Sequence, residues 1–161
     1  MEHLILASTS PRRKMILKKF NIPFSVIPPH YEEIFNNDEP GKQVLNLSKN
    51  KVQSILENKD NFKKSLILGA DTCINLDGRI IGKPKSLKEA KTFLNSFSGR
   101  SHEVITGLTL YNGIKGHFIQ KKSTTLVNFA NLENTEIEWY LRTLEWEGAA
   151  GGYRIQDKGS L

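Results

Sequence analysis

Cysteine is almost absent from this chain of 161 residues, in which Cys73 is the only one. A single cysteine cannot close a disulfide within the chain, and its solitary presence agrees with a reducing compartment. No apolar run approaches the roughly 18 residues that cross a bilayer. Residues 1–6 enter a strand-like run directly and lack the basic and long apolar regions of a signal peptide. We therefore expect a cytoplasmic protein that has no membrane partner.

Several motifs that would point to well-known chemistry are also missing. The sequence has no Gly-rich loop ending in Gly-Lys-Ser or Gly-Lys-Thr, which argues against a P-loop enzyme, and no Gly-x-Ser-x-Gly nucleophile elbow. The four histidines are isolated from one another and from Cys73 at distances that do not match zinc spacing. His102 is therefore expected to be a structural, hydrogen-bonded histidine rather than a metal ligand.

The composition is that of an ordinary globular protein, with 38% hydrophobic and 25% charged residues. A chain of this length forms one domain or two small lobes that share a core. Lys and Arg outnumber Asp and Glu by 23 to 17, which gives a net charge of +6. This balance suits an anionic partner such as a nucleotide, a nucleic acid or an acidic membrane. Scattered solvated lysines explain the same charge equally well.

Strand and helix patterns alternate along the chain, with hairpins among them. Apolar periodicity and turn residues predict strands at 4–7, 24–27, 66–70, 73–76, 79–81, 102–111, 118–129 and from 153 onward. The same reasoning predicts helices at 11–20, 42–57, 87–97 and 134–144. Together they predict an α/β fold with a mixed, twisted sheet and flanking helices.

The segment from Ser8 to Arg13 lies where the first predicted strand turns into a helix, with Ser10 as the expected N-cap and Pro11 at the first helical position. A helix N-terminus offers free backbone N–H groups, and arginine grips phosphate oxygens in pairs. These features suit a phosphate group. Taken alone, however, the segment fits an ordinary helix cap followed by a solvated basic turn better.

Charged residues also stand at other predicted element ends. Asp71 follows the apolar run 66–70, where it could bind Mg²⁺ or accept a proton from water, or simply form an Asx-turn. Lys83 follows a hairpin and could meet a phosphate. Lys51 lies on the apolar stripe of the helix at 42–57 and must extend to solvent or find an anion, the former being commoner. Glu33, taken alone, is expected to be solvated.

The order and spacing of these weak signals resemble the Maf family of nucleoside triphosphate pyrophosphatases. The resemblance runs along essentially the whole chain, and its first motif and its Ala-Asp-Thr motif are the most specific. It rests on the segments 6–13, 69–72, 82–84, 98–102 and 153–156, together with Glu33 and Lys51.

The resemblance implies a fold like that of the inosine triphosphate pyrophosphatases, with two lobes around a cleft, and a homodimer. It implies hydrolysis of dTTP or UTP to the monophosphate and pyrophosphate with a divalent metal, Mg²⁺ or Mn²⁺. Asp71 matches the proton acceptor of the family, and Glu33 and Asp71 would hold the metal. The matching catalytic and substrate-binding positions are Glu33, Lys51, Lys83, Ser8, Arg12, Arg13, Thr72 and Gln156, of which Arg12, Thr72 and Gln156 are associated with nucleotide choice.

The chain departs from the family pattern in two places. Asp157 stands where glycine is usual, and the given sequence stops at Leu161, before the strand and helix that usually follow. Residues 1–161 are therefore expected to form a single Maf-like domain without those last elements. Ser48 and Val52 occupy helix positions where small alanines are common.

The alternative function is a non-catalytic nucleotide- or nucleic-acid-binding protein, which the net positive charge favours. The carboxylates Glu33 and Asp71 argue against it if they converge on one cleft, because they would repel a phosphate backbone that brings no metal. No recognised nucleic-acid-binding motif is present in the sequence either.

Overall fold

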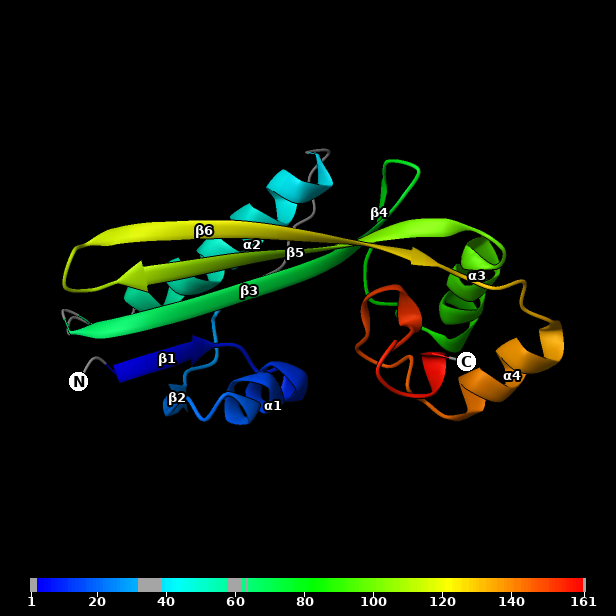
Figure 1. Cartoon of the computed structure of the whole chain (residues 1–161), viewed down its shortest axis with the longest axis horizontal. Coiled ribbons are helices and arrows are strands. Elements are labelled where there is room, and N and C mark those ends of the chain that lie inside the picture. Colours follow the sequence, from blue (N-terminus) through cyan, green and yellow to red (C-terminus); the bar gives the residue numbers. More distant parts are fainter. Residues whose placement is uncertain (1–2, 32–38, 58–61, 63, 161) are drawn as a thin grey trace. The chain divides into compact units, whose positions relative to one another are not determined.

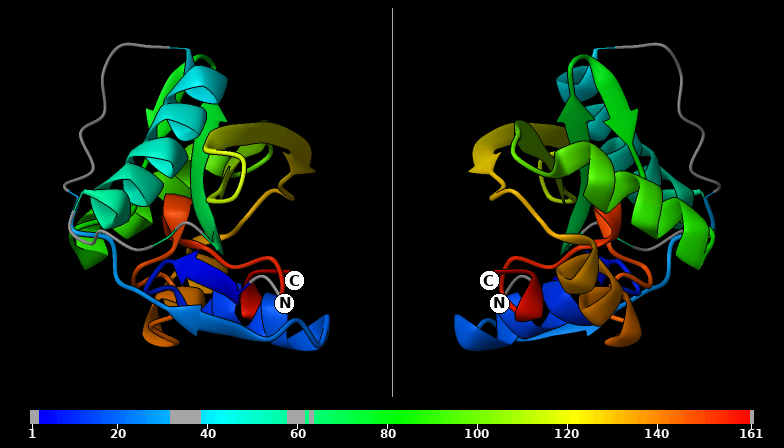
Figure 2. Two further views of the ribbon diagram at one scale, coloured as in Figure 1. Left: turned by 90° about the vertical axis from the view of Figure 1, so that its left-hand side faces the viewer. Right: turned by 90° about the vertical axis from the view of Figure 1, so that its right-hand side faces the viewer.

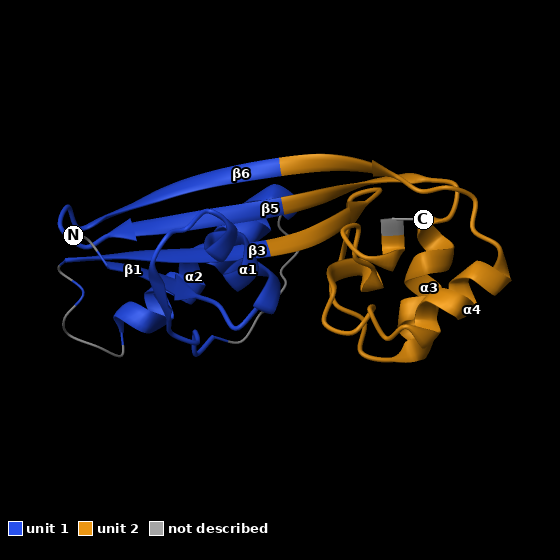
Figure 3. Ribbon diagram, turned by 60° about the horizontal axis from the view of Figure 1, so that its bottom comes forward, with its two compact units in different colours: residues 1–71, 106–123 blue, residues 72–105, 124–161 orange. Residues whose placement is uncertain are grey.

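The computed structural model describes residues 3–31, 39–57, 62 and 64–160. The chain divides into two compact units (Figure 3): unit 1 comprises Met1–Asp71 and Thr106–Ser123, and unit 2 comprises Thr72–Ile105 and Thr124–Leu161. Three long strands change from one unit to the other partway along their length. Among the helices of the described residues, none is both long enough and apolar enough to cross a bilayer.

Six strands and four α-helices make up the described chain (Figure 1). The strands are β1 His3–Ala7, β2 Phe24–Val26, β3 Ser65–Leu76, β4 Arg79–Ile81, β5 Ser101–Asn112 and β6 His117–Asn128. The helices are α1 Pro11–Lys19, α2 Pro40–Leu56, α3 Leu87–Phe97 and α4 Asn134–Arg142. Two short 3-10 turns, Ala150–Gly152 and Lys158–Ser160, follow α4.

The strands form one sheet in the order β2-β1-β3-β5-β6, and β4 pairs with β3 outside this path. Strand β1 runs parallel to both neighbours, with Ala7 opposite Gly69 of β3, whereas β3 and β4 are antiparallel. The arrowheads of β5 and β6 point in opposite directions (Figure 1). The prediction of an α/β fold with a mixed sheet is therefore confirmed.

In unit 1, helix α2 packs against the sheet through a stripe at helical spacing, shown in cyan beside the strands in Figure 2. Its apolar members are Val44, Leu47, Val52 and Ile55, all nearly inaccessible to solvent. The strands contribute Ile5, Ala7 and Ile67 to the same core. Burial of this stripe stabilises unit 1, because apolar area removed from water contributes about 25 cal/mol per Å².

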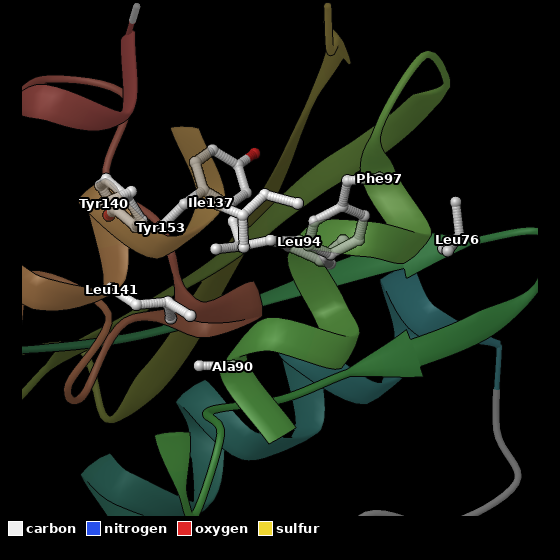
Figure 4. Close-up of a cluster of buried hydrophobic side chains, with 9 residues drawn as sticks. Leu76, Ala90, Leu94, Phe97, Ile137, Tyr140, Leu141 and Tyr153 are labelled. Atoms are coloured by element: carbon white, nitrogen blue, oxygen red, sulfur yellow. The ribbon is translucent and has the colours of Figure 1, made fainter. Parts of the chain in front are cut away.

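In unit 2, helices α3 and α4 pack together around a second apolar core (Figure 4). The hydroxyl of Ser86 accepts a hydrogen bond from the Glu89 backbone N–H at 3.2 Å and so caps the first turn of α3. Gly99 follows the helix with a φ of 67°, which glycine adopts without steric cost. The core side chains are Ile74, Leu76, Ala90, Leu94, Phe97, Ile137, Tyr140, Leu141 and Tyr153.

Two predicted strand boundaries are wrong. The runs 66–70 and 73–76 form one continuous strand, β3, so Asp71 lies inside the strand and not at its end. Pairing with β1 ends at Gly69 and pairing with β4 begins at Ile74, and the polar residues between these regions resembled a break in the sequence. β5 continues as the neighbour of β3, which allows the backbone to remain extended.

No strand begins at Tyr153 in the described chain. Gly151 and Gly152 both have φ values near 70°, which turns the backbone out of an extended path. The Arg154 backbone N–H then donates to the Tyr140 hydroxyl at 3.1 Å instead of to a neighbouring strand. The apolar character of Tyr153 reflects its place in the unit 2 core.

Candidate functional site

The most unusual feature of unit 1 is a buried ion pair between Lys51 of α2 and Asp71 of β3. Lys51 is 6% exposed and Asp71 is 4% exposed. Charged residues are rarely buried so completely unless they are paired, because removing a charge from water is costly. Of the two alternatives that the sequence left open for Lys51, the structure therefore shows the less common one, in which the lysine meets an anion.

The fold of unit 1 explains why these two side chains meet. Residues two apart on a strand share a face, so Ile67, Gly69 and Asp71 point the same way. A Cβ atom on Gly69 would lie 2.4 Å from the Ser48 carbonyl oxygen of α2. This face of β3 therefore lies very close to α2. Asp71 is the next residue on the same face after Gly69, and its carboxylate is within reach of the Lys51 side chain.

The N-terminus of α1 forms a second part of the candidate site in unit 1. Ser8 is 3% exposed, and its hydroxyl accepts hydrogen bonds from the Ser10 backbone N–H and from Arg13 Nη1, both at 3.2 Å. Ser10 occupies the predicted N-cap position, but its side chain makes no capping bond. The serine before the cap thus orders the turn and holds Arg13, and Arg12 beside it is half-buried.

Strand register links these two parts. Ser8 follows Ala7, which is paired with Gly69, and Asp71 lies two residues beyond Gly69. The α1 N-terminus and Asp71 therefore both come just after Ala7 and Gly69, the last residues at which β1 and β3 pair with each other. In sheets with parallel strands, ligands bind near the carboxyl ends of those strands. The arrangement can present positive charge and N–H donors to an anion beside one carboxylate.

The other described site residues that the sequence predicted, Thr72, Lys83 and Gln156, belong to unit 2. In unit 2, Thr72 is half-buried, whereas Lys83 and Gln156 are exposed. The Gly151 backbone N–H donates to the Gly82 carbonyl at 2.8 Å, which holds the loop of Lys83 against the turn that leads to Gln156. Glu33 lies outside the described residues.

A divalent cation fits the donors that are present only if substrate supplies further ligands. Across the parts of the chain that the structure describes, no three His, Cys, Asp or Glu side chains are grouped as a metal site. Mg²⁺, however, is usually bound by one or two carboxylates and completed by substrate phosphates and water. The buried carboxylate of Asp71 is a hard oxygen donor of this kind.

Sequence reasoning missed the polar contacts that hold α2 in place. Ser48 and Thr109 are both fully buried, and their hydroxyl oxygens lie 2.7 Å apart. Asn50 Nδ2 donates to the Tyr31 hydroxyl at 2.8 Å. The available signal was the position of Ser48 on the apolar stripe of α2, since a buried hydroxyl requires a hydrogen-bond partner.

The prediction for His102 is confirmed. His102 is 2% exposed, its Nε2 lies 2.6 Å from the Tyr153 hydroxyl, and its ring packs 4.4 Å from that of Phe97. Burial lowers the pKa of His102 and raises the pKa of Tyr153 to about 12. His102 is therefore a neutral core residue at neutral pH.

His102 is expected to make the fold sensitive to acid. Its lowered pKa means that the unfolded chain takes up the proton first, so stability falls as pH decreases through the unfolded value of 6.5. We expect His102→Leu to be less stable at pH 7 but to lose less stability between pH 7 and pH 5 than the unmutated protein. Urea unfolding at both pH values measures this difference, and an equal loss in both proteins would contradict it.

Comparison with known proteins gives a consistent result. The family model described as "Maf-like protein" matches residues 3–161. A protein of Ruminiclostridium cellulolyticum named dTTP/UTP pyrophosphatase is 37% identical over 163 residues, which cover 100% of this chain and 83% of that protein. Proteins of the same name from Pyrococcus abyssi and Halalkalibacterium halodurans are 40% and 41% identical, over 98% and 99% of this chain and 81% and 82% of their own lengths.

Proposed function

This chain belongs to the Maf family, and on that premise we propose that it hydrolyses dTTP and UTP to the monophosphate and pyrophosphate. Relatives named dTTP/UTP pyrophosphatase are similar along nearly the whole chain, which supports this substrate class. The observation that carries the proposal is the buried pair of Lys51 and Asp71, placed next to the register position where α1 presents Ser8 and Arg13.

In the proposed mechanism, Asp71 accepts a proton from the water that attacks the α-phosphorus. Its position on a continuous strand holds the carboxylate rigidly, and a positioned base of this kind contributes about 10² to 10⁴ in rate. Lys51 and Arg13 are proposed to bind the triphosphate oxygens and to stabilise the charge that shifts onto the leaving pyrophosphate. The Ser8 hydroxyl keeps Arg13 oriented for this contact.

Asp71 and Glu33 are the residues proposed to hold a divalent cation, Mg²⁺ or Mn²⁺. Such a cation, when bound, neutralises phosphate charge and orients the attacking water. Glu33 enters this set through the family resemblance alone, because it lies outside the described residues.

The proposal is tested by measuring pyrophosphate release from a panel of nucleoside triphosphates with Mg²⁺, with Mn²⁺ and with a chelator. We expect dTTP and UTP to be the best substrates and the chelator to abolish release. Release of inorganic phosphate instead of pyrophosphate would contradict cleavage at the α-phosphorus. Sedimentation of the same preparation tests the homodimer that the family resemblance implies.

Gln156 is proposed to take part in reading the base, together with Arg12 and Thr72. Its exposed side chain offers both a donor and an acceptor, which suits the edge of a pyrimidine. We expect Gln156→Ala to reduce the preference for dTTP and UTP over other nucleotides more than it reduces the best rate. Relative kcat/KM values across the panel measure this preference.

The matched control for Gln156 is Asn95→Ala, which removes an exposed amide from α3 of the same unit. The Asn95 side chain donates to the carbonyl of Lys91 in its own helix at 2.8 Å. This control should leave the substrate preference unchanged. An unaltered preference in Gln156→Ala would remove Gln156 from the proposed base-reading set.

A further inference from the structure

We infer that the buried hydroxyl pair of Ser48 and Thr109 is a positioning device that fixes helix α2 on the sheet so that Lys51 meets Asp71. The inference rests on the proposed function, in which Lys51 binds substrate phosphate. Ser48 precedes Lys51 by three residues on α2, and Thr109 lies on β5. The two hydroxyls are hydrogen-bond partners of each other, so both would act through the placement of the helix.

The hydroxyl pair belongs to a small polar network inside unit 1. The Ser48 and Thr109 oxygens lie 2.7 Å apart, and Ser48 also donates to the Leu45 carbonyl at 2.9 Å. Gln120 Nε2 of β6 lies 3.0 Å from the Thr109 hydroxyl and 2.8 Å from the Leu45 carbonyl. The network therefore connects one turn of α2 to two strands, β5 and β6.

Apolar packing alone does not fix the position of α2 along its own axis. Gly69 and Gly107 let the helix backbone approach the sheet, since a Cβ atom at either position would lie within 2.5 Å of a carbonyl oxygen of α2. These contacts set the distance between helix and sheet. Hydrophobic burial is non-directional, however, so it tolerates a small slide or rotation of the helix.

Hydrogen bonds supply the missing direction, because they weaken steeply away from their preferred distance and angle. Residues three apart on a helix share a face, so the bond at Ser48 fixes the same face that carries Lys51. The Lys51 ammonium is carried on a flexible four-carbon stem, so where it lies relative to the buried Asp71 carboxylate depends on where α2 places its Cα. A misplacement on the order of 1 Å can reduce turnover about a hundredfold.

Two substitutions at Thr109 distinguish the effect of its hydroxyl from the effect of its side-chain shape. Thr109→Val keeps the branched shape and removes the hydroxyl, whereas Thr109→Ser keeps the hydroxyl and removes a buried methyl group. If the pair positions Lys51, kcat/KM for dTTP should fall about tenfold in the valine variant and stay near the original value in the serine variant. A purely packing role predicts the reverse order, and that result would overturn the inference.

A second readout does not depend on turnover. The rate of reductive methylation of Lys51, followed by peptide mass spectrometry, reports how often its buried amine opens to solvent. We expect this rate to rise several-fold in Thr109→Val and not in Thr109→Ser. Ile137→Val is the control for general loss of stability, because Ile137 is a fully buried core residue of unit 2; it should alter neither readout.

The two readouts also distinguish failure of this inference from failure of the proposed function. If no nucleotide is hydrolysed but Lys51 is methylated faster in Thr109→Val than in Thr109→Ser, the positioning role stands and the proposed activity fails. If hydrolysis occurs but neither turnover nor labelling differs between Thr109→Val and Thr109→Ser, the positioning role is refuted and the proposed activity stands.

Discussion

Replacing Asp71 with asparagine is expected to lower pyrophosphate release from dTTP by at least about a hundredfold, the low end for removal of a positioned proton acceptor. The amide has nearly the same shape as the carboxylate, but it cannot accept the proton or bind a divalent cation well. Asp71 is 4% exposed and lies inside a continuous strand, so the backbone of β3 should keep its path. Steady-state release measured with Mg²⁺ and with Mn²⁺ checks this result.

The same substitution should destabilise the fold, since it leaves the buried charge of Lys51 without its carboxylate. Breaking a buried ion pair by removing one partner costs about 3 to 5 kcal/mol. The double variant Lys51→Met/Asp71→Asn removes both charges, and we expect it to regain part of the stability lost in Asp71→Asn. Urea unfolding of the two single variants and the double variant measures this coupling.

Turnover and stability should therefore respond differently to the double substitution. We expect the double variant to be more stable than Asp71→Asn but no more active. Recovery of turnover along with stability would show that Asp71 serves the fold alone. Wild-type turnover in Asp71→Asn would eliminate it as the proton acceptor.

Replacing Gly107 with alanine is expected to destabilise unit 1 by about 2 to 3 kcal/mol, within the range for forcing extra volume into a packed interior. A Cβ atom at this position would lie 2.5 Å from the Val44 carbonyl oxygen and 2.6 Å from its carbonyl carbon. Both atoms belong to the α2 backbone, so no side chain can rotate away to make room. Urea or thermal unfolding measures the effect.

Gly82→Ala is the matched control for this stability measurement. A Cβ atom at Gly82 would meet nothing within 4 Å, and Gly82 does not have a positive φ. We expect its unfolding free energy to stay within about 0.5 kcal/mol of the original. Equal effects of the two substitutions would mean that the close approach of α2 to β5 does not limit stability.

The helices could be predicted closely because their signals are local. The apolar stripe of α2 is visible within a few turns of sequence, and the structure confirms it. Ser86 and Gly99 mark the two ends of α3 in the same local way. The errors at Asp71 and Tyr153 have a common cause, because both depend on which strand lies alongside. Strand neighbours come from distant parts of the chain, and local composition does not specify them.

The sequence by itself determined the residue types and their order: a mixed α/β pattern, the Ser8 to Arg13 turn and the lysine on an apolar stripe. Only the tertiary structure decided that Lys51 meets Asp71, that Ser8 and not Ser10 orders the α1 N-terminus, and that Ser48 finds Thr109. The physical reason is that a buried charge or hydroxyl requires a partner, which the sequence can signal. Which group becomes that partner depends on strand register and on the close helix–sheet approach at Gly69 and Gly107.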